Sequence, residues 1–167
     1  MIDESRLQKV TLQMLATDAA QETFVMFLAD EASGRAVPIG IGAAEATSIL
    51  LAMEGEKFPR PLSHDLLQQI LRVLDATLER IVITEIKENA FCATLCIRSR
   101  QNELMEVDAR PSDSVALGLR MGTPLYMSEL IFEEAAIELP SGESTRFDKF
   151  VESEMKLSEF WHRKQDE

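Results

Sequence analysis

Cysteine, histidine and positive charge are all scarce in this chain of 167 residues. Its two cysteines, Cys92 and Cys96, lie four positions apart in an apolar run. On a strand they would share one face without the geometry for a disulfide, so we expect two buried thiols. Neither these cysteines nor the two histidines, His64 and His162, have the spacing of a zinc site.

Lysine and arginine number 17 against 29 aspartates and glutamates, which gives a formal net charge of −12. This balance argues against a protein that coats nucleic acid nonspecifically and against one that binds anionic membranes. It is still compatible with a small local basic site. The sequence also has no apolar run of membrane-spanning length and no signal-peptide pattern. We therefore expect a cytoplasmic protein.

Apolar side chains, in contrast, are abundant: 46% of the residues are hydrophobic, which is enough for a real core. Alternating patterns predict two antiparallel meanders, and the spacing of apolar residues predicts helices between and after them. The predicted strands cover 6–14, 24–29, 35–41, 80–87, 91–97, 104–109 and 124–127, and Pro38 suggests a strand end or a sheet edge. The predicted helices cover 43–55, 63–79, 111–122 and part of 129–138.

Because these helices occur in blocks and do not alternate with parallel strands, we expect an α+β fold with antiparallel meanders packed against about three helices. This domain would occupy residues 1–138. A linker over 140–144 and a C-terminal amphipathic helix, with apolar residues from Phe147 to Trp161, would follow within 139–167. The apolar face of that helix could dock on its own domain or on a second subunit. With exposed strand edges in addition, we expect a homo-oligomer, with a dimer as the simplest case.

Two similar stretches contain most of the candidate catalytic and binding residues. The first, Pro59 to Asp65, reads Pro-Arg-Pro-Leu-Ser-His-Asp and separates two helical segments, because its prolines cannot continue a helix. Ser63 would be the N-cap of the second of these helices. The other stretch, Asp108 to Asp113, places arginine, proline, serine and aspartate at the start of a later helix. Helix starts offer free N–H groups to anions, so the two stretches together would suit a phosphate.

Each candidate residue also has a plain structural interpretation. Glu45, Asp65 and Asp113 lie in first turns, where acids complement the helix dipole by about 0.3–1 kcal/mol; the same field keeps them ionised, as metal ligands require. His64 could exchange a proton near neutral pH or simply cap a helix. The two arginines of these stretches could grip a phosphate or pair with nearby acids. The serines, Ser63 and Ser112, would be caps before they are nucleophiles.

Three segments resemble the bifunctional nuclease family, which occurs in bacteria and plants. They are Ile39–Ala46 (IGIGAAEA), Phe58–Leu67 (FPRPLSHDLL) and Val107–Leu117 (VDARPSDSVAL), and the resemblance covers roughly residues 5–138. It implies nuclease activity on RNA and on DNA, particularly single strands. The family's motif residues correspond here to Glu45, Arg60, Pro61, His64, Asp65, Asp108, Arg110, Pro111, Ser112 and Asp113. Ser63 stands where threonine is more usual, and Ser114 where alanine is common.

We therefore expect a nuclease that hydrolyses phosphodiester bonds with the help of a divalent metal such as magnesium or manganese. The metal ligands would be Asp65, Asp113 and either Asp108 or Glu45. His64, Asp65 and Asp113 would carry the catalysis, and Arg60, Arg110, Ser63 and Ser112 would hold the phosphate. The alternatives are a non-catalytic module that binds a nucleotide-like anion or a protein, which the acidic net charge favours, and a purely structural subunit.

Overall fold

The computed structural model describes residues 2, 4–18, 23–30 and 32–139. Within these residues, eight strands form one sheet in the order β6-β5-β4-β7-β1-β2-β3-β8, and the fold is α+β as the sequence predicts. The elements are η1 (Glu4–Arg6), β1 (Leu7–Asp18), β2 (Thr23–Asp30), β3 (Arg35–Ile41), α1 (Ala43–Glu54), α2 (Ser63–Val73), β4 (Thr77–Lys87), β5 (Ala90–Arg98), β6 (Leu104–Ala109), α3 (Pro111–Met121), β7 (Leu125–Ser128), α4 (Glu129–Ala135) and β8 (Ile137–Glu138). The predicted linker and C-terminal helix lie outside the described residues.

The long strand β1 joins the two halves of the sheet. Its first residues, Leu7–Val10, pair with β7, and the residues from Thr11 onward pair with β2. A bulge between Leu12 and Met14 follows this change of partner, and bulges bend a strand and increase its twist. Both predicted meanders, β1-β2-β3 and β4-β5-β6, are present and antiparallel. β7 returns beside β4 in the parallel direction.

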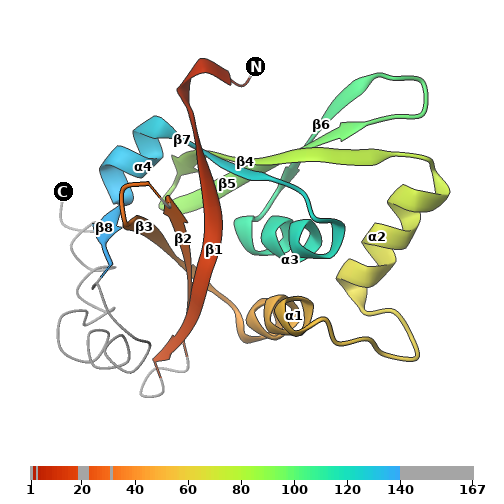
Figure 1. Cartoon of the computed structure of the whole chain (residues 1–167), viewed down its shortest axis with the longest axis horizontal. Helices are drawn as coiled ribbons and strands as arrows, with labels where there is room; N and C mark the ends of the chain where they lie inside the picture. The colour runs from red at the N-terminus through yellow and green to blue at the C-terminus, as the bar shows by residue number, and fades with distance from the viewer. Residues whose placement is uncertain (1, 3, 19–22, 31, 140–167) are drawn as a thin grey trace.

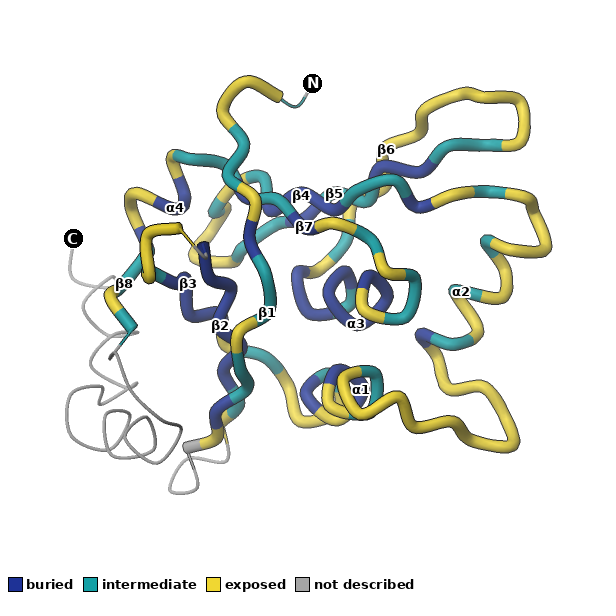
Figure 2. Tube along the Cα trace, in the orientation of Figure 1, coloured by how far each residue is buried: buried dark blue, intermediate teal, exposed yellow. Residues whose placement is uncertain are grey.

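Helix α3 lies at the centre of the molecule (Figure 1). It packs against α1, α2, β4 and β5, and seven of its eleven residues are buried. Gly118 permits this packing, because a Cβ there would lie 2.6 Å from Cδ1 of Ile81 on β4. Figure 2 shows the contrast with α2, whose trace is mostly exposed. The central position of α3 brings its first turn close to the starts of the other two helices.

Two details of the predicted elements were wrong. The second helix ends at Val73 instead of Glu79, because Asp75 adopts a left-handed φ of 51° and the chain then enters β4 at Thr77. Leu78, counted with the helix, is a buried residue of that strand. Of the cysteines, Cys96 is buried and Cys92 only half-buried, and both are free thiols.

Pro38 fits its predicted place at an edge. It pairs with Phe27 of β2, whereas β8 reaches only Arg35 and Ala36 on the other side of β3. At Pro38, β3 therefore has a described neighbour on one side only, as at a sheet edge.

Candidate functional site

Three helix starts converge, and they bring together side chains that are 16 to 65 positions apart in the sequence. Glu45 lies in the first turn of α1, His64 and Asp65 in that of α2, and Asp113 in that of α3. The residue before α3 is Arg110, whose extended φ and ψ of −72° and 145° make it the N-cap. Pro111 occupies the first helical position, where its missing N–H has no cost.

A continuous chain of hydrogen bonds links these helix starts. Arg110 donates from Nη2 to Glu45 Oε1 at 2.7 Å and from Nε to Asp113 Oδ2 at 2.8 Å. The other Asp113 oxygen, Oδ1, lies 3.0 Å from His64 Nε2. His64 Nδ1 in turn lies 2.8 Å from Ser48 Oγ on α1. We call Glu45, Ser48, His64, Arg110 and Asp113 the site cluster.

The solvent exposure of the side chains decreases across the cluster, from Arg110 to His64. The Arg110 side chain is 66% exposed and that of Asp113 31%, whereas that of His64 is only 10% exposed. Burial alone would raise the pKa of Asp113, but hydrogen bonds from Arg110 and His64 outweigh it and hold this pKa below its usual value. Hydrogen bonds to Asp113 and Glu45 raise the pKa of Arg110. An ionised carboxylate beside a permanent cation therefore faces solvent.

These contacts also fix the histidine tautomer. An ionised carboxylate only accepts hydrogen bonds, so His64 Nε2 donates to Asp113. In a neutral imidazole, Nδ1 is then an acceptor, and the Ser48 hydroxyl donates a hydrogen bond to it. Serine, histidine and aspartate stand in a row, but Ser48 is buried within the packing of α1 and its hydroxyl already binds the ring. This geometry suits Ser48 to orienting His64, which in turn orients Asp113.

Asp65 points away from the cluster and into a separate ion pair. Its Oδ1 accepts from Arg120 Nε at 2.6 Å, and its Oδ2 accepts from the backbone N–H of Leu62 at 2.9 Å. Arg120, whose side chain is 8% exposed, also donates to the carbonyl oxygens of Ser48 and Ala116. The hydrogen bond from Arg120 lowers the pKa of Asp65 despite partial burial. Both carboxylate oxygens are thus engaged: Oδ1 joins α2 to α3 through Arg120, and Oδ2 caps the start of α2 itself.

The remaining predicted residues lie outside the cluster. Ser63 is not the N-cap of α2: Leu62 is, and its backbone N–H donates to the Asp65 carboxylate. Ser112 is the second residue of α3 and is buried, so it does not cap that helix either. Arg60 is exposed in the loop before α2, and Asp108 is exposed on β6 opposite Thr94.

No three His, Cys, Asp or Glu side chains gather as a metal-binding group among the described residues. Within the cluster, Glu45 and Asp113 bracket Arg110, so a cation placed between them would have to displace the guanidinium. The described residues therefore do not form a ready-made metal centre.

Sequence reasoning did not find Ser48 or Arg120. One signal was available for each: Ser48 lies three positions after Glu45, and Arg120 lies seven positions after Asp113, so each shares a helix face with a motif residue. The partners of both come from other helices, however, and helical spacing does not indicate them.

Comparison with known proteins identifies the family of this chain. A family model described as the bifunctional nuclease domain matches residues 26–140, a span that contains the whole site cluster. The chain belongs to the bifunctional nuclease family. An uncharacterised protein of Mycobacterium tuberculosis is 35% identical over 126 residues, which cover 75% of this chain and 74% of that protein.

More distant relatives of this family member come from rice. A protein named bifunctional nuclease 1 from Oryza sativa is 20% identical over 116 residues, or 68% of this chain. A bifunctional nuclease of Oryza minuta is similar to the same extent. The chain spans only 35% of the length of these plant proteins.

Proposed function

We propose that this chain is a nuclease that hydrolyses phosphodiester bonds of RNA and DNA, preferentially in single strands, at the site cluster. One observation carries the proposal. Arg110 is held between two carboxylates, is largely exposed, and makes no hydrogen bond through Nη1 to any described residue. Its two free N–H groups are available to a phosphate oxygen, beside a carboxylate that is kept ionised.

In this proposal Arg110 binds the scissile phosphate and neutralises charge as it develops on the phosphoryl oxygens. A water molecule beside Asp113 attacks phosphorus, and the Asp113 carboxylate accepts the proton that the water loses. The bond from phosphorus to the leaving sugar oxygen breaks, and that oxygen takes a proton from solvent. His64 remains buried and acts as a positioning residue, because both of its ring nitrogens hold partners. This departs from the sequence-based hypothesis, in which His64 itself exchanges the proton.

A divalent metal stays part of the proposal as a separately testable element. Asp113 and Glu45 are the carboxylates of the cluster, but both bind Arg110, so they would hold a cation only if the guanidinium moved away from them. The other candidate ligands fit less well, because Asp65 is engaged by Arg120 and Asp108 lies on β6. When bound, a metal would supply further neutralisation of the phosphate. Sensitivity of cleavage to a chelator, reversed by added magnesium or manganese, would support this element.

Arg110→Lys tests the proposed phosphate clamp. Lysine keeps the charge but loses the fork that spans Glu45 and Asp113, so KM for a labelled single-stranded RNA should rise about tenfold, equivalent to about 1.4 kcal/mol. Arg100→Lys is the matched control, since Arg100 is 76% exposed and lies 3.8 Å from Asp75. An unchanged KM in Arg110→Lys would contradict the assignment of Arg110.

A non-catalytic module that binds a nucleotide-like anion remains the second candidate. This candidate is favoured by the hydrogen bonding of Asp113. Both of its carboxylate oxygens already accept hydrogen bonds from within the cluster, which leaves the carboxylate less free to take a proton from water. The acidic net charge of −12 points the same way. Binding of single-stranded oligonucleotides without any cleavage, with or without metal, would favour this candidate.

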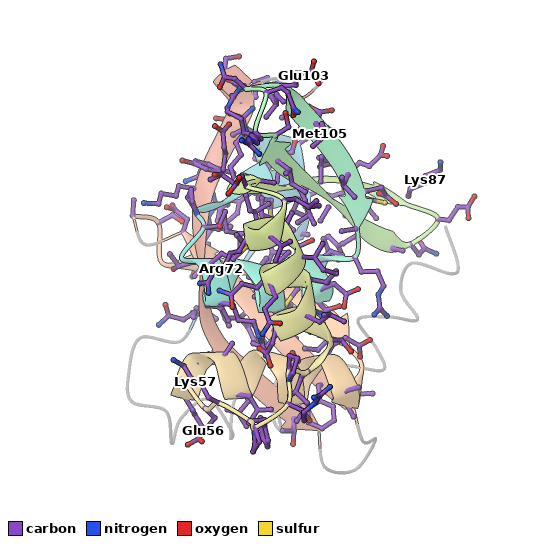
Figure 3. The ribbon with its side chains drawn as sticks, turned by 90° about the vertical axis from the view of Figure 1, so that its right-hand side faces the viewer. Glu56, Lys57, Arg72, Lys87, Glu103 and Met105 are labelled. Atoms are coloured by element: carbon purple, nitrogen blue, oxygen red, sulfur yellow. The ribbon has the colours of Figure 1, made fainter. Side chains whose placement is uncertain are left out.

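We further propose a cytoplasmic homodimer. No helix of the described part of the chain is long and apolar enough to cross a membrane. Figure 3 looks onto the face formed by α2, with β6 above it. Exposed large apolar residues occur on both elements: Leu66, Leu67, Ile70, Val73 and Leu74 on or next to α2, and Leu104, Met105 and Val107 on β6. Apolar patches of this kind commonly mark protein–protein contacts, and a second copy offers the same surface.

A further inference from the structure

A hollow of about 450 Å³ lies beside the site cluster, and its walls other than Arg110 take no part in the chemistry described above. Its walls come from β2, the end of β3, the turn into β5 and the start of α3. The lining residues are Thr23, Phe24, Val25, Ile39, Gly40, Ile41, Gly42, Asn89, Ala90, Phe91, Arg110, Pro111 and Ser112. This volume falls in the range of small-molecule sites in proteins.

Arg110 belongs both to the hollow and to the site cluster. A molecule that fills the hollow therefore places one end against the guanidinium. The first turn of α3 lines the same end, and its dipole favours negative charge there. The occupant should accordingly carry an anionic group at the edge of the hollow.

The rest of the lining calls for a flat apolar group. Two aromatic residues, Phe24 of β2 and Phe91 of β5, line the hollow from different strands, and valine, isoleucine, alanine and proline supply five of the other eleven lining residues. Gly40 lines the hollow between Ile39 and Ile41 without contributing a side chain. Asn89, in the turn between β4 and β5 with a φ of 63°, makes no side-chain hydrogen bond to any described residue. The side-chain amide of Asn89 is thus available for hydrogen bonds to polar atoms on the edge of a bound ring.

We infer that this hollow binds the base of a nucleotide whose phosphate is held by Arg110. The inference rests on the proposed function and adds a subsite to it. A base that stacks on an aromatic ring must be unpaired and unstacked from its neighbours, so the hollow selects single strands over duplexes. Stacking accepts every base, which gives broad specificity across RNA and DNA sequences.

Direct binding tests the inference without requiring cleavage. Inorganic phosphate, ribose 5-phosphate, uridine 5′-monophosphate and adenosine 5′-monophosphate are titrated into the full chain and followed by NMR or calorimetry. The two nucleotides should bind about fivefold to a hundredfold more tightly than ribose 5-phosphate, the range expected for one stacked base. Phe91→Leu should remove most of this gain while keeping apolar packing. Phe58→Leu is the matched control, because Phe58 is exposed and does not line the hollow.

A second variant keeps the test decisive if Phe91→Leu does not fold. Gly40 is exposed, has no positive φ and lies within β3, where a β-branched residue is well tolerated. Gly40→Val should occupy the hollow and abolish the gain from the base, while affinity for inorganic phosphate changes by less than twofold.

The outcomes separate this inference from the proposed function. Equal affinities for the nucleotides and ribose 5-phosphate would overturn the base subsite, even if the chain cleaves single-stranded RNA. A nucleotide advantage that survives in both Phe91→Leu and Gly40→Val would overturn it too, because the base would then bind elsewhere. Conversely, a nucleotide advantage lost in both variants, in a chain that cleaves nothing, would support the subsite and contradict the nuclease.

Discussion

Replacing Ser48 by alanine removes one hydroxyl from the interior of the site cluster and leaves the backbone contacts of α1 in place. The hydroxyl lies 2.8 Å from Nδ1 of His64, and both residues are buried. Leaving the ring nitrogen without a partner costs about 1–3 kcal/mol. The better helix propensity of alanine returns about 0.5 kcal/mol. We therefore expect the free energy of unfolding to fall by about 1–2 kcal/mol.

Urea unfolding followed by far-ultraviolet circular dichroism measures this change, with a fall in Tm of roughly 2–8 °C as a second readout. Thr47→Ala is the matched control on the same helix. Its hydroxyl is exposed and donates only to the carbonyl oxygen of Ala43, so its removal should change stability by less than about 0.5 kcal/mol. Equal, small losses in the two variants would refute the buried bond between Ser48 and His64.

The same variant distinguishes an orienting serine from a nucleophile. As a positioning residue, Ser48 should affect kcat about tenfold or less when replaced by alanine, and Ser48→Ala should retain the product pattern of the wild type. Complete loss of cleavage in a folded Ser48→Ala protein would instead indicate a serine nucleophile.

Three further predictions follow from contacts elsewhere in the fold. Gly118→Val should destabilise the protein by about 1–3 kcal/mol in urea unfolding, because the new side chain meets Ile81; an unchanged stability would contradict the close packing of α3 on β4. The pKa of Asp65 is lowered by Arg120, so the pair stabilises the fold fully above the unfolded-state value near 3.9 and loses this contribution as pH falls further. Asp65→Asn should therefore lose less stability than the wild type between pH 5 and pH 3, and parallel pH profiles would argue against the pair. Ile70→Glu should convert the proposed dimer into a monomer in light scattering, whereas a wild-type protein that is itself monomeric would contradict the interface on α2.

Local patterns explain how much of the fold was predictable. Both meanders and the starts of the three main helices follow from period-two and period-3.6 spacing together with prolines and glycines, and all are present in the structure. The end of α2 was not predictable in this way. Leu74 and Leu78 continue the helical spacing, but the left-handed turn at Asp75 redirects the chain, and only tertiary packing assigns Leu78 to a strand. The exposure of α2 likewise depends on what packs against it and not on its own pattern.

The candidate site was predictable in its members more than in its connections. The repeated arginine, serine and aspartate pattern pointed to two helix starts, and the structure brings His64 and Asp113 from those starts into contact. The sequence placed Asp65 in the same group, yet its carboxylate turns to Arg120 at the other end of α3. Neighbouring residues on a helix differ by about 100° in direction, so adjacent motif residues can serve different partners.

Cleavage by Asp113→Asn tests the central claim most directly. The purified wild type and variant are assayed on labelled single-stranded RNA and DNA, beside Asp75→Asn, which makes the same change at an exposed aspartate 3.8 Å from Arg100. The account predicts that Asp113→Asn, folded by circular dichroism, loses at least about a hundredfold in kcat, the scale of a general base, while Asp75→Asn matches the wild type. Equal cleavage by all three proteins would contradict the assignment of the chemistry to the site cluster.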